Sequence, residues 1–284
     1  MIAPSVVKRH ILQHRDLPSL PEVAVRVLEI VDNPRASASE LSRAISLDPA
    51  LTARVLRLAN SALYGFTRRI GSTVQAVTVL GFSQVRSVVL TISILDIFSR
   101  QGRERIIPHR RIWEHSLACA VAARLLASRA RLCPPEEAFV TGLLHDLGKI
   151  VLAAALPGEY QQALIRATAE QRRLVDAEMV VLNVSHAEVG RWVAEKWQLP
   201  QLLCEAIASH HRWQEELSGL ARCLYAANVL VSTSQFGWTG NGRPVPLLDD
   251  VRQALSLDER ATAALSTELA GQYAAAKQLL ALPV

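Results

Sequence analysis

The sequence predicts an all-α protein, with a compact N-terminal helical lobe packed on a larger helical bundle. Apolar residues recur at helical spacing along most of the chain, almost no stretch alternates as a strand would, and Gly and Pro fall between the periodic segments. The chain has 284 residues and is 50% hydrophobic, which is enough for a real core. We expect the lobe over residues 1–108 and the bundle with its closing helices over 109–284, joined by the polar stretch 101–111. Because this stretch is short, the two parts should pack rigidly and unfold together.

The N-terminal lobe is predicted from its helix caps and breakers. An extended LPSLP stretch at 17–21 leads into the first helix. Ser37 and Glu40 have the spacing of a capping box, and Asp48 precedes a proline at a first helical position. Gly81 breaks the last apolar segment in two. The expected helices are Glu22–Val31, a short helix after Ser37, Pro49–Leu63, Thr73–Leu80 and Gln84–Phe98.

The larger bundle is predicted from longer amphipathic segments. The expected helices are Trp113–Arg131, Glu136–Ala155, Gly158–Gln171, Arg172–Asn183, Ser185–Trp197, Pro200–His211 and Leu217–Thr233. A glycine-rich loop over 235–245 and one or two closing helices over 247–282 should complete it.

The stretch FVTGLLHDLGKIVL at 139–152 places a polar pair, His145 and Asp146, inside an otherwise apolar helix. A buried polar pair needs partners. Five histidines lie at wide separations in predicted helices, and a helical bundle can gather such residues onto one metal site. They are His115, His145, His186, His210 and His211. The alternative is a structural hydrogen-bond network without metal.

Cysteine usage and the N-terminus predict a cytoplasmic, soluble protein. The four cysteines stand singly without CxxC spacing, so we expect buried hydrophobic side chains in a reducing compartment and no disulfides. The N-terminus lacks a continuous apolar signal region, and no apolar run reaches the length of a membrane span.

The charge distribution does not favour nucleic acid as a partner. Residues 1–110 carry 15 Lys/Arg against 8 Asp/Glu, whereas 111–284 carry 16 against 18. The N-terminal arginines alternate with apolar positions on amphipathic helices, which is typical of solvated helix faces. Two helices meeting at Asp48–Pro49 resemble a helix-turn-helix, but the turn lacks glycine and the second helix offers few side chains for base edges.

Four separated signatures resemble the HD superfamily of metal-dependent phosphohydrolases. They are WEHS at 113–116, LLHDLGK at 143–149, SHAEVG at 185–190 and SHH at 209–211. The N-terminal segments LPSLP at 17–21, LDPALTARVLRLANSALYG at 47–65 and AVTVLGF at 76–82 are similar to the HDOD domain, the HD-related output domain of bacterial signalling proteins. The resemblance extends from about Leu17 to Trp213.

The resemblance implies a metal site that holds iron, manganese or zinc, as one ion or two. Residues matching the first metal's ligands are His115, His145 and Asp146, and those matching the second metal's are His186, His210 and His211, with Asp146 as the bridge. Asn228 falls where HD enzymes carry a last aspartate, so it would be a weak ligand. Lys149 would steady the carboxylate or a phosphate, as a candidate catalytic residue; the alternative is a surface lysine.

The resemblance further implies a bacterial signalling output module that acts through protein or ligand binding. Its partners would be a separate sensor or receiver chain and a nucleotide or other phosphorylated ligand. The alternative function is a metal-dependent phosphohydrolase acting on a nucleotide or phosphodiester. Cyclic-di-GMP hydrolysis is not expected, because the glycine-tyrosine-proline signature of that branch does not follow the histidine pair, where HHRWQEELSG stands. The oligomeric state stays open.

Overall fold

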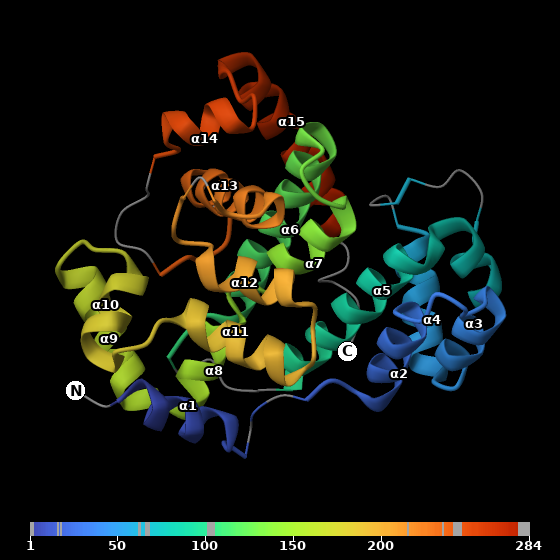
Figure 1. Ribbon diagram of the computed structural model, residues 1–284, viewed down its shortest axis with the longest axis horizontal. Coiled ribbons are helices and arrows are strands. Elements are labelled where there is room, and N and C mark those ends of the chain that lie inside the picture. The colour runs from blue at the N-terminus through green and yellow to red at the C-terminus, as the bar shows by residue number, and fades with distance from the viewer. Residues whose placement is uncertain are drawn as a thin grey trace. The chain divides into compact units, whose positions relative to one another are not determined.

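The computed structural model describes residues 3–277 apart from 16, 18, 62–63, 66–68, 101–105, 215, 235 and 241–245, and only the backbone of 95–100. Every regular element in this part of the chain is a helix, so the all-α prediction is confirmed (Figure 1). The described residues form two units. The larger is built from Met1–Leu17 and Arg103–Leu269, and the smaller from Pro18–Gly102 and Ala270–Val284.

The smaller unit is organised around its longest helix, α5. Three shorter helices pack against it. The bounds are α2 Glu22–Val31, α3 Ala38–Ser46, α4 Pro49–Ala59 and α5 Thr73–Arg100. Helix α5 is kinked at Gly81, where the backbone leaves the helical region at φ 79° and ψ 168°. The predicted break at this glycine is therefore confirmed.

The predicted helix caps of the smaller unit are present. The Ser37 hydroxyl accepts a hydrogen bond from the Glu40 backbone N–H at 3.1 Å, and the Asp48 carboxylate accepts from the N–H groups of residues 50 and 51. Helix α4 ends at Ala59, earlier than expected, because the Asn60 side chain exchanges hydrogen bonds with the backbone of Ile70.

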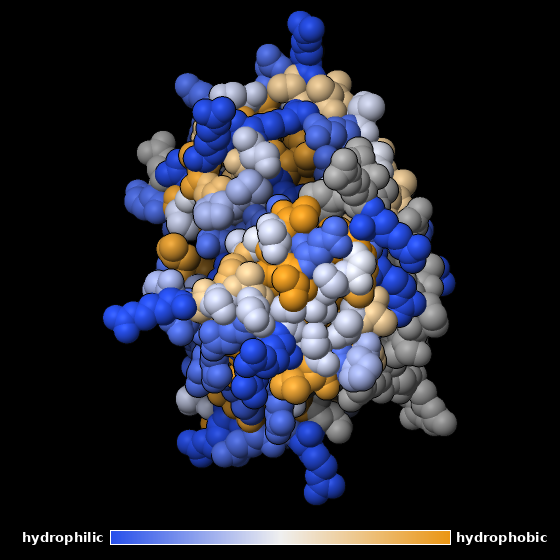
Figure 2. Space-filling model, turned by 90° about the vertical axis from the view of Figure 1, so that its right-hand side faces the viewer, coloured by the Kyte–Doolittle hydropathy of each residue, from blue (hydrophilic) through white to orange (hydrophobic). Residues whose placement is uncertain are grey.

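The surface in Figure 2 intersperses hydrophilic residues with small hydrophobic groups. Exposed apolar side chains of the smaller unit include Val25, Leu47, Val74 and Val79.

The larger unit contains the remaining helices. They are α1 Pro4–Leu12, α6 His109–Ala130, α7 Pro135–Leu144, α8 Leu147–Ala155, α9 Pro157–Ala169, α10 Leu174–Leu182, α11 His186–Lys196, α12 Gln201–Ser209, α13 Gly219–Thr233, α14 Asp249–Ala254 and α15 Glu259–Lys277, whose last turns belong to the smaller unit. Helix α6 is buried along most of its length and packs against α7 and α13. Gly142 allows a close approach there, because a Cβ at this position would lie 2.6 Å from the Cα of Ala120.

Helix α1 was not predicted from the sequence. It packs against α8 and α11 and buries Val7 and Ile11. The His10 Nε2 lies 3.1 Å from the carbonyl of Ala155, and Lys196 donates a hydrogen bond to the carbonyl of Leu12. These contacts explain why residues before Leu17 group with the larger unit.

The predicted single helix 136–155 is wrong, because the chain turns between α7 and α8. Asp146 has φ −97° and ψ 5°, and the helix restarts at Leu147. Gly148 then packs directly on α11, since a Cβ there would lie 1.9 Å from the carbonyl oxygen of His186. The turn and this close contact bring the polar pair at 145 and 146 next to the start of α11.

Two helical stretches are long and apolar enough to cross a membrane by length and composition only. They are Thr73–Ile94 and Pro135–Ala155. Of the most apolar 18 residues in each, 61% are buried inside the protein in the first stretch and 89% in the second. The second is also interrupted by the turn at His145 and Asp146. Both therefore have the burial of core helices.

Candidate metal centre

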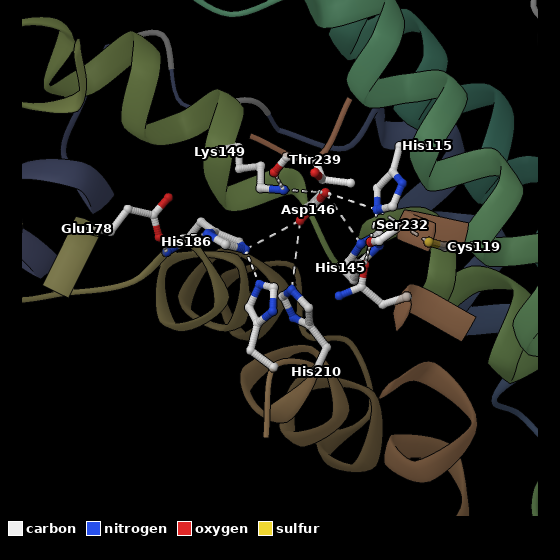
Figure 3. A network of polar contacts seen from close by, with 12 residues as sticks. His115, Cys119, His145, Asp146, Lys149, Glu178, His186, His210, Ser232 and Thr239 are labelled. Carbon is white, nitrogen blue, oxygen red and sulfur yellow. Dashed lines mark hydrogen bonds and ion pairs between the residues drawn. The ribbon is translucent and has the colours of Figure 1, made fainter. Parts of the chain in front are cut away.

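The Asp146 carboxylate lies at the middle of a buried polar cluster in the larger unit (Figure 3). The cluster draws side chains from α6, the α7–α8 turn, the first residue of α11, the end of α12 and α13. All seven residues predicted as metal ligands are brought together here: His115, His145, Asp146, His186, His210, His211 and Asn228. His211 is half-buried and the others are buried.

One carboxylate oxygen faces the residues predicted for the first metal. Asp146 Oδ2 lies 3.4 Å from His145 Nε2 and 3.8 Å from His115 Nε2. The amide of Asn228 is on the same side, with its Oδ1 at 3.1 Å from His115 Nε2. These atoms surround a space between α6, α13 and the α7–α8 turn.

The other carboxylate oxygen faces the residues predicted for the second metal. Asp146 Oδ1 lies 3.4 Å from His186 Nε2 and 3.8 Å from His210 Nε2. His211 Nε2 is 2.8 Å from His186 Nε2. The carboxylate is thus placed between two histidine groups, as a bridging ligand would be.

The surrounding protein orients four of the imidazoles. The Nδ1 atoms of His145 and His210 lie 2.8 Å and 2.7 Å from the carbonyls of Gly142 and Ile207, and Nδ1 of His115 lies 3.2 Å from the carbonyl of Phe236. Nδ1 of His186 is 2.6 Å from a Glu178 oxygen. Because these oxygens only accept hydrogen bonds, a ring that donates Nδ1–H to one of them leaves its Nε2 lone pair free for a ligand on the Asp146 side.

Three buried atoms at the centre have no hydrogen-bond partner among the described residues: His145 Nε2, Asp146 Oδ1 and His210 Nε2. Leaving such atoms unsatisfied costs free energy, so native proteins rarely do so without a bound ion or water. All three are ligand atoms for divalent transition metals. The residues therefore fit a metal ion.

Burial favours the neutral form of four histidines of the centre. It lowers the pKa of His115 to about 4, against a smaller opposing effect of the Asp146 charge. Burial is also the main cause that lowers the pKa values of His145, His210 and His211. Burial alone would raise the pKa of Asp146, but its interactions with His145 and Lys149 hold it well below its usual range. Neutral imidazoles beside an ionised carboxylate are the protonation states that metal binding requires.

Lys149 is a buried residue of the centre and not a surface lysine. Its ammonium lies 2.7 Å from Asp146 Oδ2 and 2.8 Å from the carbonyl of Thr239, and its side chain is 2% exposed. Of the glycine-rich loop, residues 236–240 are described, whereas 235 and 241–245 lie outside the described residues. The described part lies against the centre. The carbonyls of Phe236 and Thr239 contact His115 and Lys149, and the backbone N–H of Trp238 donates a hydrogen bond to the carbonyl of Arg111 at 3.0 Å.

Two buried residues of the centre were not predicted from the sequence. Glu178, on α10, accepts hydrogen bonds from both the backbone N–H and the ring of His186, at 2.8 and 2.6 Å. Cys119, read from the sequence as an ordinary buried hydrophobe, has its sulfur 3.5 Å from His115 Nε2. The i,i+4 spacing of Cys119 after His115 was the available signal, because it places both on one helix face.

A small cavity opens next to the centre. Its lining residues are Arg173, His210, His211, Tyr225, Asn228, Val229 and Ser232. The Arg173 guanidinium pairs with both oxygens of Asp176 at 2.7 and 2.8 Å. A ligand in this cavity would therefore meet polar side chains beside two of the histidines.

Comparison with known proteins identifies the family of this chain. The model of the HDOD domain matches residues 17–213, the span predicted from the sequence motifs. An uncharacterised protein of Treponema pallidum is 26% identical over 224 residues; the match covers 76% of this chain but only 42% of that protein.

One similar solved structure is that of an HDOD domain protein of unknown function from Geobacter sulfurreducens. It has 26% sequence identity and a TM-score of 0.79, and the match covers 96% of this chain and 97% of that chain. A candidate phosphohydrolase from Shewanella amazonensis has 25% identity and a TM-score of 0.74, with 95% and 98% covered. A candidate signal transduction protein from Marinobacter aquaeolei, at 22% identity and a TM-score of 0.74 over 99% of this chain and 66% of that one, shares the fold.

Proposed function

Because the chain belongs to the HDOD domain family, we propose that it is a bacterial signalling output module whose histidine–aspartate centre binds a divalent metal ion. The module acts through binding and not through turnover. Its partners are a separate signalling protein and a nucleotide or other phosphorylated ligand, and it works in the cytoplasm.

The observation that carries the metal proposal is the shared direction of the ligand atoms. Four imidazoles place Nδ1 against acceptors in the protein and Nε2 on the side of one carboxylate, and His145 Nε2, Asp146 Oδ1 and His210 Nε2 are buried without a partner among the described residues. Such a preformed set of lone pairs costs stability unless a cation fills it.

The residues that would hold the metal fall into two groups around Asp146. His115, His145 and Asn228 lie on the Oδ2 side, and His186, His210 and His211 on the Oδ1 side. A divalent metal bound there supplies a Lewis acid that polarises a phosphoryl oxygen and activates water. Glu178 orients His186 and raises its basicity as a ligand.

Two features support binding over turnover. Asn228 is a neutral amide, and among the described residues Asp146 is the one carboxylate facing both histidine groups. The Lys149 ammonium further neutralises this carboxylate at 2.7 Å. A centre with so little negative charge holds a divalent ion less tightly than one with more carboxylates, so we expect very low phosphodiesterase activity and undetectable cyclic-di-GMP hydrolysis.

The second candidate function is a metal-dependent phosphohydrolase acting on a nucleotide or phosphodiester. The hydrogen-bond donors of Arg173, Tyr225 and Ser232 around the cavity beside His210 and His211 favour it. The cavity itself has a volume of about 30 Å³, which is room for about one water molecule, so a phosphorylated substrate would bind at its mouth. The similarity to a candidate phosphohydrolase of known structure is consistent with this function.

Metal analysis of the purified protein tests the proposal. Three proteins should be purified without chelator and compared after addition of iron, manganese or zinc: the parent, His145→Ala and the control His14→Ala. His14 is a histidine of the larger unit outside the centre. We expect the parent and the control to retain a divalent metal and His145→Ala to lose it, with circular dichroism verifying that each variant is folded. A parent that takes up no more metal than His145→Ala would show that the cluster is a structural hydrogen-bond network. Turnover of a nucleotide at about one per second or faster would favour the phosphohydrolase.

A further inference from the structure

Cys119 lies against the same space as the residues of the Oδ2 side. It follows His115 by four residues on α6, and its side chain is fully buried. Its sulfur and one ring nitrogen each of His115 and His145 all lie within 4.8 Å of one another. Figure 3 shows Cys119 on the side of Asp146 that holds His115 and His145, away from His186.

The distances fit a tetrahedral ion with a sulfur ligand. With a Zn–S bond of about 2.3 Å and a Zn–N bond of about 2.0–2.1 Å, tetrahedral geometry separates the sulfur and nitrogen ligands by about 3.5 Å. The observed separation of Cys119 Sγ from His115 Nε2 is 3.5 Å. The nitrogen–oxygen edges of the same ion would be about 3.3 Å, compared with 3.4 Å from His145 Nε2 to Asp146 Oδ2 and 3.8 Å from His115 Nε2 to the same oxygen.

Without a metal, burial and the nearby Asp146 charge raise the pKa of the Cys119 thiol, so a thiolate forms here only when a metal ion replaces the thiol proton. His115 and His145 are neutral ligands, and Asp146 supplies one negative charge that it shares with Lys149. A thiolate would supply a second negative charge and balance a divalent ion. The proton of the Cys119 thiol would leave to solvent when the metal binds, as for other cysteine ligands.

We propose that Cys119 is a metal ligand, which takes the place of the weak ligand Asn228, completes a two-histidine, one-carboxylate, one-thiolate site with His115, His145 and Asp146 and makes this side of the centre selective for zinc. The inference rests on the proposed metal binding and goes beyond it by naming the metal. Thiolate ligands favour zinc over manganese, which prefers oxygen ligands.

Cobalt is the probe that tests the ligand directly, because Co²⁺ replaces zinc in tetrahedral sites and reports its ligands by absorption. The metal-free parent, Cys119→Ser and Cys119→Ala should be titrated with Co²⁺, with Cys223→Ser as a control for another buried cysteine. We expect the parent and Cys223→Ser to show both the visible bands of tetrahedral cobalt and a near-ultraviolet sulfur-to-cobalt charge-transfer band. Both Cys119 variants should keep cobalt binding but lose the charge-transfer band.

Competition between zinc and manganese gives a second readout. Cys119→Ser should lose about 10-fold or more of the parent's preference for zinc, the size of effect typical of changes around a metal ligand set. Visible cobalt bands in the parent without a charge-transfer band would overturn the role of Cys119 and leave metal binding standing, so that the thiol is only a hydrogen-bond partner of His115. Failure of folded parent protein to bind cobalt, zinc or manganese at all would overturn the metal proposal itself. Circular dichroism of each variant separates both outcomes from misfolding.

Discussion

Acid should destabilise the metal-free protein well before it protonates the carboxylates. Burial lowers the pKa of His115 to about 4, below the value of about 6.5 expected in the unfolded chain. Between these two values the unfolded chain binds a proton that the folded protein does not. Stability is therefore complete above about pH 6.5 and is lost as the pH falls towards the folded-state pKa of His115.

The magnitude follows from the width of that window. Each unit of pKa difference corresponds to about 1.4 kcal/mol, so His115 alone removes about 3 kcal/mol between pH 6.5 and 4. This is a large part of the 5–15 kcal/mol that typically stabilises a domain. The pKa values of His145, His210 and His211 are lowered too, so their effects have the same sign. Asp146 does not oppose them, because its pKa lies well below its usual range and it stays charged across the window.

Urea unfolding of chelator-treated protein, followed by circular dichroism between about pH 7 and pH 5, measures the effect. His115→Gln should reduce the pH dependence, because an amide does not titrate, whereas His14→Gln should leave it unchanged. Added metal should protect the protein, since the bound ion holds the imidazoles deprotonated. A free energy of unfolding that stays flat or rises as the pH falls from about 7 to 5 would refute the reasoning.

Three substitutions give further predictions. Asn228→Asp should tighten metal binding by about 10 to 100-fold in calorimetry, because it adds a negative charge next to the metal. The exposed control Asn33→Asp should leave the affinity unchanged. Equal affinities of the two variants would contradict the placement of Asn228 beside the metal. Gly148→Ala should destabilise the protein by at least about 1–3 kcal/mol in urea unfolding, because its Cβ would overlap the α11 backbone. The control Gly158→Ala has open space around it and should be neutral or slightly stabilising. Equal effects would count against the close packing of α8 on α11. Glu178→Gln should weaken metal affinity by about 10-fold without unfolding the protein, and an unchanged affinity would show that its hydrogen bonds do not tune the site.

Much of the helical architecture could be predicted because its signals are local. The apolar spacing in Glu22–Val31 gives α2 at its observed bounds, and the caps at Ser37 and Asp48 mark the starts of α3 and α4. Gly81 marks the kink in α5. These residues act on their own turn of the chain, so no knowledge of distant neighbours is needed to read them.

The turn at His145 and Asp146 could not be read in this way. The apolar periodicity runs through it, and no proline or positive-φ glycine marks it. The close contact of Gly148 with the backbone of His186 accompanies it, and this contact depends on the packing of α8 against α11. Helix α1 was missed for a similar reason, because its buried face is defined by α8 and α11.

The sequence by itself determined the helical class, most helix boundaries and the set of histidines with Asp146 that the structure brings together. Only the tertiary structure decided how these side chains are used. It placed Lys149 on the Asp146 carboxylate, Glu178 on His186 and Cys119 beside His115. Periodicity shows which face of a helix is buried, but the residue that each buried side chain meets is decided by how separate helices pack. Cys119 therefore reads as a core residue in the sequence and as a candidate ligand in the folded protein.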